Sequence, residues 1–453
     1  MAAQEKERLI LADKNLYKGL FKLALPVMLA NLLRAVYDLV DTFFLGGIAD
    51  AVNAQAAVAI ASPLINAAAA LFMGLAIGLV AVMSRAVGEG DKRAARAFAG
   101  NAAAFGLILS LVVTAVIFFA CPPLLRGLTD GKTLEYAFIY IRVRAFELPA
   151  VMTFELFRGA RQAQGDTVTP VAYSSISVAL NIGLTALFVF SGLGIFGASL
   201  STVISQWAVV PLCAVGLFKS KKYLTSRAAD LMPKKETMLP LLKVSVPSAV
   251  SGATAAIGFL VLQYLVRGYG DGVIAAFSVC NRITNILTVP IAALGAVLTA
   301  FIGQNLGNGN GRRALASYKA SRNAAVLLMT VLAAAMFFCR APVINLLSRD
   351  DGVREAALEY IVWALASLPL LGLFQNYCGG CNGYGKTGYT FIMEGARLWA
   401  LRLPLVLLFN KFAPFGRAGI WYAMMISNAV ICILGFVLLK IATRKQKINK
   451  NSV

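Results

Sequence analysis

Five acidic residues stand inside long apolar stretches of the sequence: Asp38, Asp41, Glu147, Glu155 and Glu394. A charged side chain in such a stretch costs about 3 kcal/mol when the stretch enters a bilayer, so its presence indicates a function. A carboxyl group there can take up and release a proton, or bind Na⁺ together with neighbouring oxygen atoms. Either reaction can couple the movement of a cation to another event in the membrane.

Asp41 is the strongest candidate for such a coupling group, because it lies deep in its apolar stretch and far from the lysines of the loops. The alternative is a structural Asp41 that bonds to another helix of its own half. Asp38 follows Arg34 by four residues, which places both side chains on one helical face and predicts an ion pair. Arg34 could also gate access by pairing with either acid in different states, which predicts strong pH dependence in an Arg34→Ala variant.

The other three acids each have an arginine three residues away on the same helical face, which predicts local neutralisation. A substrate or coupling role for Glu394 stays open, because Arg402 follows further along and charges of both signs there indicate a buried network. The three expected pairs are Arg144–Glu147, Glu155–Arg158 and Glu394–Arg397.

The elements that carry these residues are expected to cross a membrane. Of the 453 residues, 59% are hydrophobic and 14% are charged, whereas soluble domains have about 45–50% and about 25%. Apolar runs long enough to cross a hydrocarbon core of about 30 Å recur from end to end, and prolines inside them, such as Pro149, predict kinks. We predict an all-α integral membrane protein with twelve transmembrane helices, near residues 18–45, 53–83, 94–119, 134–162, 168–191, 196–218, 239–268, 272–305, 313–338, 354–383, 388–410 and 418–440.

The net charge is +21 at pH 7 and the pI is near 9.9. In a soluble protein this excess would indicate a nucleic-acid partner. Here the lysines and arginines gather in alternate connections between apolar runs, which is the positive-inside pattern. The pattern predicts a multi-pass plasma-membrane protein with both termini in the cytoplasm and no nucleic-acid partner. The polar N-terminus from Met1 to Asp13 does not have the pattern of a signal peptide.

A charged segment from Lys219 to Glu236 divides the expected spans into six and six. It predicts an N-terminal six-helix lobe at 1–222, a cytoplasmic linker at 223–236 and a C-terminal six-helix lobe at 237–453. A solvated linker is the simpler interpretation, although its lysines could also contact lipid headgroups.

The two halves resemble each other when one is shifted by about 220 residues. Each half would have six spans, so the repeats are parallel, and repeats of this kind occur in transporters with substrate sites at their interface. Two similar lobes would also allow alternating access by rocking against each other. The matched segments include Gly88–Ala94 with Gly307–Ala314, Leu148–Pro149 with Leu368–Pro369, Gly159 with Gly379, and Gly197 with Gly419.

Four segments are similar to those of the multidrug and toxic compound extrusion (MATE) family, over nearly the whole chain. They are Tyr37-Asp-Leu-Val-Asp-Thr-Phe-Phe-Leu-Gly46, Arg158-Gly-Ala-Arg-Gln-Ala-Gln-Gly-Asp-Thr167, Gly197-Ala-Ser-Leu-Ser-Thr202 and Cys381-Asn-Gly-Tyr-Gly-Lys-Thr387. The resemblance implies a V-shaped pair of six-helix lobes. It also implies export of small amphipathic, often cationic, compounds in exchange for H⁺ or Na⁺.

The resemblance to the prokaryotic DinF-like branch of this family also implies a coupling-ion site in the N-terminal lobe. The family's positions fall on Asp41, Asn181 and Thr202, while Thr185 stands where the branch has a second Asp. A pair of carboxylates that shares one proton is therefore not expected at this site. The site would hold H⁺ or Na⁺ at Asp41, and no other metal or cofactor is expected.

The second half has no acid at the position that corresponds to Asp41, where Gln263 falls within one residue. The coupling site is therefore expected in the first half, while polar residues of the second half could bind substrate or act in gating. With Arg34, Asp38 and Glu394, these gating or substrate candidates are Gln263, Asn281, Arg282, Gln375 and Asn376.

Several functions are disfavoured by what the sequence lacks. It has no histidine, which excludes a histidine proton relay, and no phosphate-binding loop that would indicate drive by ATP. Cys378 and Cys381 have a redox or metal spacing but no second pair of ligands, so a role as small buried side chains is favoured. We predict a transporter and not an enzyme, with a small amphipathic substrate, membrane lipid around it and no obligate protein partner. The alternative is a flippase for a lipid-linked sugar or another lipid, for which Arg34, Arg282 and Arg397 would supply basic groups.

Overall fold

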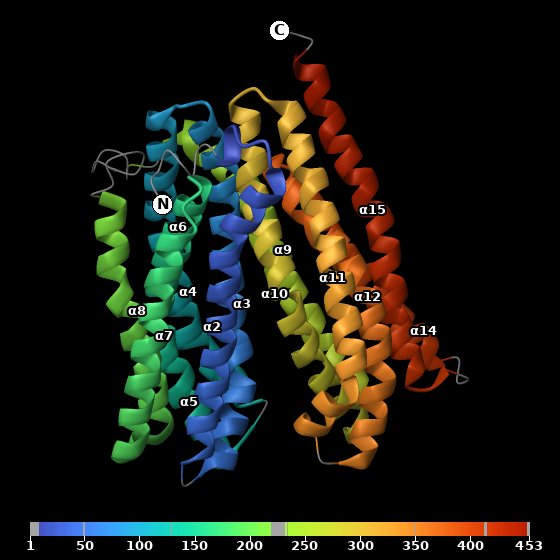
Figure 1. The fold of residues 1–453 in the computed structure, drawn as a ribbon. Coiled ribbons are helices and arrows are strands. Elements are labelled where there is room, and N and C mark those ends of the chain that lie inside the picture. Colours follow the sequence, from blue (N-terminus) through green and yellow to red (C-terminus); the bar gives the residue numbers. More distant parts are fainter. Residues whose placement is uncertain are drawn as a thin grey trace. The chain divides into compact units, whose positions relative to one another are not determined.

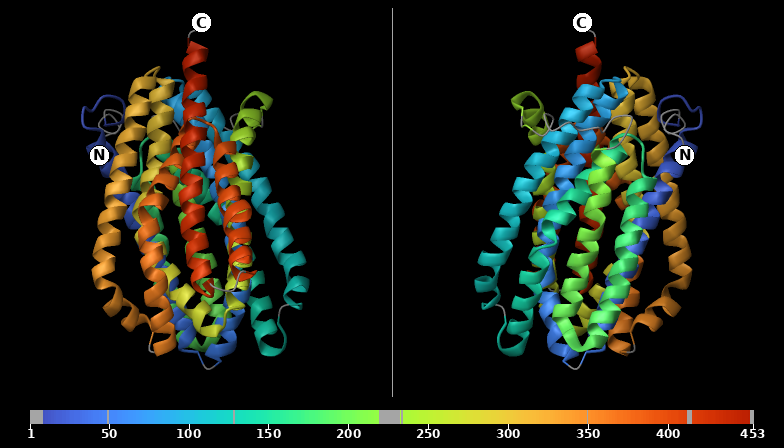
Figure 2. Two further views of the ribbon diagram at one scale, coloured as in Figure 1. Left: turned by 90° about the vertical axis from the view of Figure 1, so that its right-hand side faces the viewer. Right: turned by 90° about the vertical axis from the view of Figure 1, so that its left-hand side faces the viewer.

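The computed structural model describes residues 9–48, 50–127, 129–218, 232, 234–348, 350–411 and 415–450, with the backbone alone for 35–43, 218, 267, 271 and 445–450. Nearly all of these residues are helical, as Figures 1 and 2 show. In the first half of the chain the helices are α2 (Leu16–Gly46), α3 (Ala51–Gly88), α4 (Lys92–Leu125), α5 (Gly131–Ala145), α6 (Leu148–Ala163), α7 (Val168–Phe188) and α8 (Gly194–Phe218). In the second half they are α9 (Lys235–Arg267), α10 (Asp271–Gly307), α11 (Gly311–Leu347), α12 (Asp351–Gly383), α13 (Thr387–Gly395), α14 (Leu403–Lys411) and α15 (Ala418–Lys450).

The helices agree with the predicted fold class of an all-α membrane protein built from two repeated halves. Nine helical stretches among the described residues are long and apolar enough to cross a membrane. The predicted fourth span consists of two helices, α5 and α6, which break next to Pro149 at the start of α6. The eleventh consists of α13 and α14, joined by the π-helical turn Ala396–Arg402, and a second π-helical turn, Val189–Leu193, joins α7 to α8.

The described chain forms two compact units, each of which takes one helix segment from the other half of the sequence. Of the described residues, those within 26–253 form the first unit, and those within 9–25 and 254–450 form the second. The first part of α2 therefore packs with the second half of the sequence, and the first part of α9 packs with the first half. The predicted division into lobes at the 223–236 linker stays a prediction, because most of that linker lies outside the described residues.

Specific contacts hold the two exchanged segments in their units. In the second unit, the Arg313 guanidinium donates to the backbone carbonyl oxygens of Ile10 (2.9 Å) and Asp13 (2.7 Å), and Asn305 also donates to Ile10 (3.2 Å). In the first unit, Gly78 of α3 lies against Ser245 of α9, where a larger side chain would collide with the backbone. Small residues allow helices to approach closely in the absence of a hydrophobic driving force within lipid.

Each unit has its own buried core. That of the first unit includes Phe72, Leu79 and Met83 on α3, none of them more than 1% exposed. That of the second unit is built around Phe277, Tyr360 and Trp421, whose rings stack, with 4.1 Å between the ring centroids of Tyr360 and Trp421. Many large apolar side chains of both units are exposed, as expected for helices in a membrane.

Candidate ion-coupling and substrate sites

A cluster of hydroxyl and amide side chains lies buried between α7 and α8 in the first unit. Asn181 Nδ2 donates to Thr202 Oγ1 at 3.1 Å, and Thr185 Oγ1 donates to Asn181 Oδ1 at 3.4 Å. Thr185 Oγ1 also lies 2.6 Å from Ser201 Oγ. None of the four side chains is more than 1% exposed. The structure therefore brings together three residues predicted for the coupling-ion site and adds Ser201, which the prediction omitted.

Local structure explains how these four residues meet. The chain reverses between α7 and α8 at Gly192 and Gly194, whose φ angles of 83° and 51° favour glycine. Asn181 and Thr185 are one turn apart on α7, and on α8 the hydroxyls of Ser201 and Thr202 both donate to the carbonyl oxygen of Ala198. A hydroxyl group that donates its proton in this way can still accept a hydrogen bond or bind a cation through its oxygen.

Ser201 could have been found from the sequence, because it stands in the same segment, 197–202, that carried the family resemblance. Its position next to Thr202 gave no sign of its partner, however. The 2.6 Å contact with Thr185 depends on the rotation of α8 against α7, which is a property of the tertiary structure.

The predicted acids of the first span cannot be placed in this cluster. The side chains of Asp38 and Asp41 lie outside the described residues, although the backbone of α2 is helical there. The predicted ion pair between Arg34 and Asp38 likewise lies outside the described residues. Arg34 itself is exposed. The roles assigned to these three residues stay predictions.

The three predicted arginine–glutamate pairs are present. Arg144 Nε lies 2.7 Å from a carboxylate oxygen of Glu147, and Arg397 Nη2 lies 2.9 Å from Glu394 Oε2. Arg158 binds the buried carboxylate of Glu155 through both Nε and Nη2. These pairs confirm local neutralisation of the acids, since each carboxylate has a guanidinium one turn away.

The polar residues of the second unit that were predicted to bind substrate or act in gating do not form one cluster: Asn281 and Asn376 form hydrogen bonds to different neighbouring helices. Asn281 of α10 donates to Phe277 O (2.9 Å) and its Oδ1 accepts a 3.5 Å hydrogen bond from the Tyr360 hydroxyl of α12. Asn376 of α12 is buried and donates to Ser321 Oγ of α11 (2.7 Å). The remaining candidates differ in exposure: Gln263 and Gln375 are half-buried and Arg282 is exposed.

Arg402 is a buried cation that the predicted site did not include. Its side chain is 5% exposed, and it donates from Nε to Ser427 Oγ (3.1 Å) and from Nη2 to Asn428 Oδ1 (2.7 Å) on α15. It ends the π-helical turn Ala396–Arg402, a kind of distortion that often occurs at functional sites. A sequence signal existed, because Arg402 corresponds to Asn181 when the two repeats are aligned. The predicted buried network is thus present in part, with Arg402 bound to neutral partners.

The cysteine spacing has a structural explanation. Cys378 and Cys381 are free thiols on α12, both at most 5% exposed, inside a core cluster with Phe374 and Tyr377. Burial in such a cluster is the usual environment of a small apolar side chain.

Two repeated helical units with polar centres inside apolar helices have the architecture of a polytopic membrane transporter. The chain belongs to the MatE family, whose model matches residues 26–187 and again residues 247–408. The resemblance found in the sequence is therefore confirmed, and the two matches follow the repeats.

Known proteins are similar to the chain over nearly its full length. It is 25% identical over 409 residues to the probable multidrug resistance protein YpnP of Bacillus subtilis (strain 168), which covers 90% of this chain and 91% of that protein. It is 23% identical over 428 residues to the probable multidrug resistance protein NorM of Thermotoga maritima, which covers 90% and 89%. A solved outward-facing multidrug resistance MATE family transporter has a TM-score of 0.88 at 23% identity and covers 97% of this chain and 98% of that structure.

Proposed function

We propose that this protein exports small amphipathic organic molecules in exchange for a cation, and that the cation binds at the α7–α8 cluster together with Asp41. The observation that supports this proposal is the buried group of four oxygen-bearing side chains, Asn181, Thr185, Ser201 and Thr202. The chain's membership of a transporter family and the names of its relatives support drug-like substrates over a lipid-linked sugar.

The chemistry of the cluster favours Na⁺ over H⁺ as the coupling ion. Hydroxyl and amide oxygens are ligands for hard metal cations, and they do not take up a proton at neutral pH. A proton would need only the carboxyl group of Asp41, and nothing in that reaction would use the oxygens of Thr185 and Ser201. With Na⁺, Asp41 supplies the negative charge and the cluster supplies further ligands.

The orientation of the protein is proposed from its charges. The end of the second unit at which α2 begins carries many lysines and arginines, including Lys14, Lys18 and Lys319, whereas the arginines of the opposite end, such as Arg354 and Arg417, are paired with acids. Under the positive-inside rule the basic end faces the cytoplasm. This supports a multi-pass plasma-membrane protein with both termini in the cytoplasm.

Transport in proteoliposomes tests the function. A fluorescent cationic dye is followed under an imposed Na⁺ gradient and, separately, under an imposed pH gradient. We expect Na⁺-driven dye movement that Asp41→Asn abolishes. Ser174→Ala serves as the control, because Ser174 lies on α7 and its hydroxyl donates only to Val171 O of the same helix. Dye movement that follows the pH gradient alone would leave export intact and exclude Na⁺. Movement that ignores both gradients and survives Asp41→Asn would contradict the proposal.

A further inference from the structure

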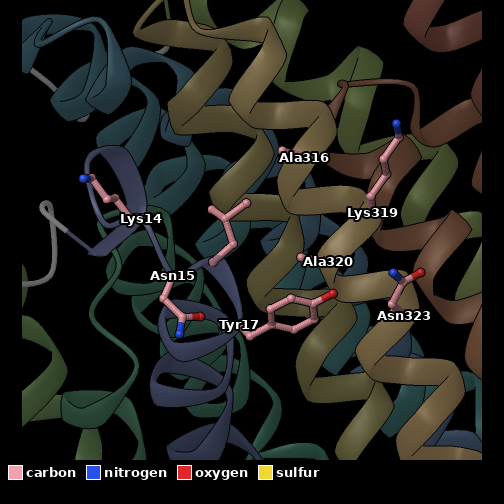
Figure 3. Close-up of a pocket in the computed structure, with 8 residues that line it drawn as sticks. Lys14, Asn15, Tyr17, Ala316, Lys319, Ala320 and Asn323 are labelled. Atoms are coloured by element: carbon pink, nitrogen blue, oxygen red, sulfur yellow. The ribbon is translucent and has the colours of Figure 1, made fainter.

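A pocket of about 540 Å³ lies in the second unit between the start of α2 and the first turns of α11 (Figure 3). Lys14 and Lys319 stand on opposite sides of it, and the Tyr17 ring reaches from α2 toward α11 close to Ala320. Asn15 and Asn323 add amide groups. The pocket is remote in sequence from the α7–α8 cluster and shares no residue with it.

The surroundings of the pocket are strongly basic. Among residues 9–25 and 300–323 the sequence has a single acid, Asp13, whose carboxylate accepts the backbone N–H of Asn15 (2.9 Å). Neither Lys14 nor Lys319 forms an ion pair with any described carboxylate. Two ammonium groups that have no carboxylate partner among the described residues favour an anionic ligand. The same segments also contain Lys18, Lys22, Arg312, Arg313 and Arg322.

The pocket continues into an apolar surface on both of its helices. Along α2, exposed Tyr17 is followed at helical spacing by Phe21 (39% exposed) and Leu25 (65%). Along α11, exposed Asn323 is followed by Leu327 (67%) and Val331 (55%). The exposed faces of both helices therefore change from polar to apolar in the direction that leads from the pocket into the membrane.

We propose that this pocket binds the headgroup of an anionic glycerophospholipid from the cytoplasmic leaflet. Lys14 and Lys319 would attract the negatively charged headgroup from opposite sides of the pocket, and the amides of Asn15 and Asn323 would bond to its oxygens. The acyl chains would lie along Phe21, Leu25, Leu327 and Val331. Basic pockets between transmembrane helices on the cytoplasmic side are suited to such headgroups, and tyrosine is favoured at this depth of the membrane. The apolar continuation is what favours a lipid over a soluble anion.

Lipid binding to the purified full-length protein tests the proposal. Native mass spectrometry would follow the retention of phosphatidylglycerol against an excess of phosphatidylcholine. Two lysines near a headgroup predict that the double variant Lys14→Gln, Lys319→Gln binds phosphatidylglycerol about 10- to 30-fold more weakly. The control is Arg312→Gln, Arg444→Gln, which removes the same charge from the same end of the unit at residues that do not line the pocket. Equal loss in both double variants would overturn the proposal, because it would show a general charge effect.

Two further measurements distinguish a defined lipid site from a site for a soluble anion. Ala316→Phe would fill the pocket without changing charge, and we expect it to reduce retention of phosphatidylglycerol while the protein stays monodisperse. Inorganic phosphate and glycerol 3-phosphate are added as competitors that have no acyl chain. Failure of both to displace the lipid at millimolar concentration supports a lipid site, whereas displacement by either at low concentration would show that the ligand is a soluble anion and would overturn the lipid assignment.

Discussion

The polar centres of the two units occupy corresponding places in the repeats and are built from different chemistry. In the first unit, Asn181 of α7 bonds to Thr202 of α8, and every described side chain of the cluster is uncharged. In the second unit, Arg402 stands at the position of Asn181 and bonds to Ser427 and Asn428 of α15. Each centre joins the fifth predicted span of its half to the sixth.

The difference indicates why only one of the two centres would exchange a cation with solution. A guanidinium remains protonated in proteins and carries its charge on a fixed side chain. Arg402 therefore supplies a permanent cation to the oxygens of Ser427 and Asn428. The side chains at the corresponding place in the first unit carry no fixed charge, so a cation bound there could dissociate. We expect the first unit to respond to Na⁺ and the second to be insensitive to it.

The largest expected effect follows from removing the fixed cation. Arg402→Leu leaves two buried polar groups, on Ser427 and Asn428, without their donor and should destabilise the protein by about 2–4 kcal/mol. Thermal unfolding in detergent measures this, with Arg312→Leu as the control at an exposed arginine. Wild-type stability in Arg402→Leu would show that the guanidinium does not hold η3, the turn Ala396–Arg402, to α15.

Adding a charge to the first centre should strengthen its affinity for cations. Thr185→Asp places a carboxylate beside Asn181 and Ser201, and a charge-assisted contact is worth about 1.5–3 kcal/mol. We expect Na⁺ to bind about tenfold or more tightly, measured as the Na⁺ concentration that gives half of the maximal thermal shift. We also expect a pH gradient to drive dye transport in this variant, because the new carboxyl group can carry a proton. An unchanged response to both ions would argue that the cluster is not a cation site.

Removing one oxygen from the first centre should have a smaller effect. Ser201→Ala deletes the hydroxyl that contacts Thr185 at 2.6 Å. Loss of one ligand worth about 1 kcal/mol predicts about fivefold weaker Na⁺ binding with the maximal transport rate retained. Ser199→Ala is the matched control, because the Ser199 hydroxyl is also buried on α8 and donates to Ile195 O of its own helix. If both variants weaken Na⁺ binding equally, the effect belongs to α8 as a whole.

The smallest effect is expected at a half-buried arginine of the second unit. Arg417 lies between α14 and α15 and bonds to Glu355 (2.9 Å) and Glu359 (2.8 Å). These hydrogen bonds raise the pKa of the Arg417 guanidinium. A cationic group whose pKa is higher in the folded protein than in the unfolded chain stabilises the fold in full at every pH below the pKa of the unfolded chain. This contribution to stability is lost only as the pH rises through the pKa of the folded protein. Arg417→Gln should lower the free energy of unfolding by less than about 1 kcal/mol. Unfolding curves of the variant and the wild type should differ by the same amount at pH 7 and at pH 9. A loss as large as that of Arg402→Leu would remove the distinction between half-buried and fully buried cations.

The sequence by itself determined the elements and much of the chemistry. Its apolar runs predicted the spans because a stretch of about 20 apolar residues can satisfy its backbone groups only as a helix in lipid. The repeats and the arginine–glutamate pairs one turn apart follow from spacing along the chain. The family and the residues Asn181, Thr185 and Thr202 follow from the similarity of segments of the sequence to that family. Such features depend on local geometry or on similarity, both of which a linear sequence carries.

Only the tertiary structure decided which distant residues meet. The contact of Thr185 with Ser201, the neutral partners of Arg402, the exchange of the first parts of α2 and α9 between units, and the pocket beside Tyr17 all depend on how one helix is rotated and placed against another. In a membrane-spanning helix most faces are apolar, so the hydrophobic pattern does not show which face meets a neighbour. That choice depends on close packing of small side chains and on buried hydrogen bonds between residues that are far apart in the sequence.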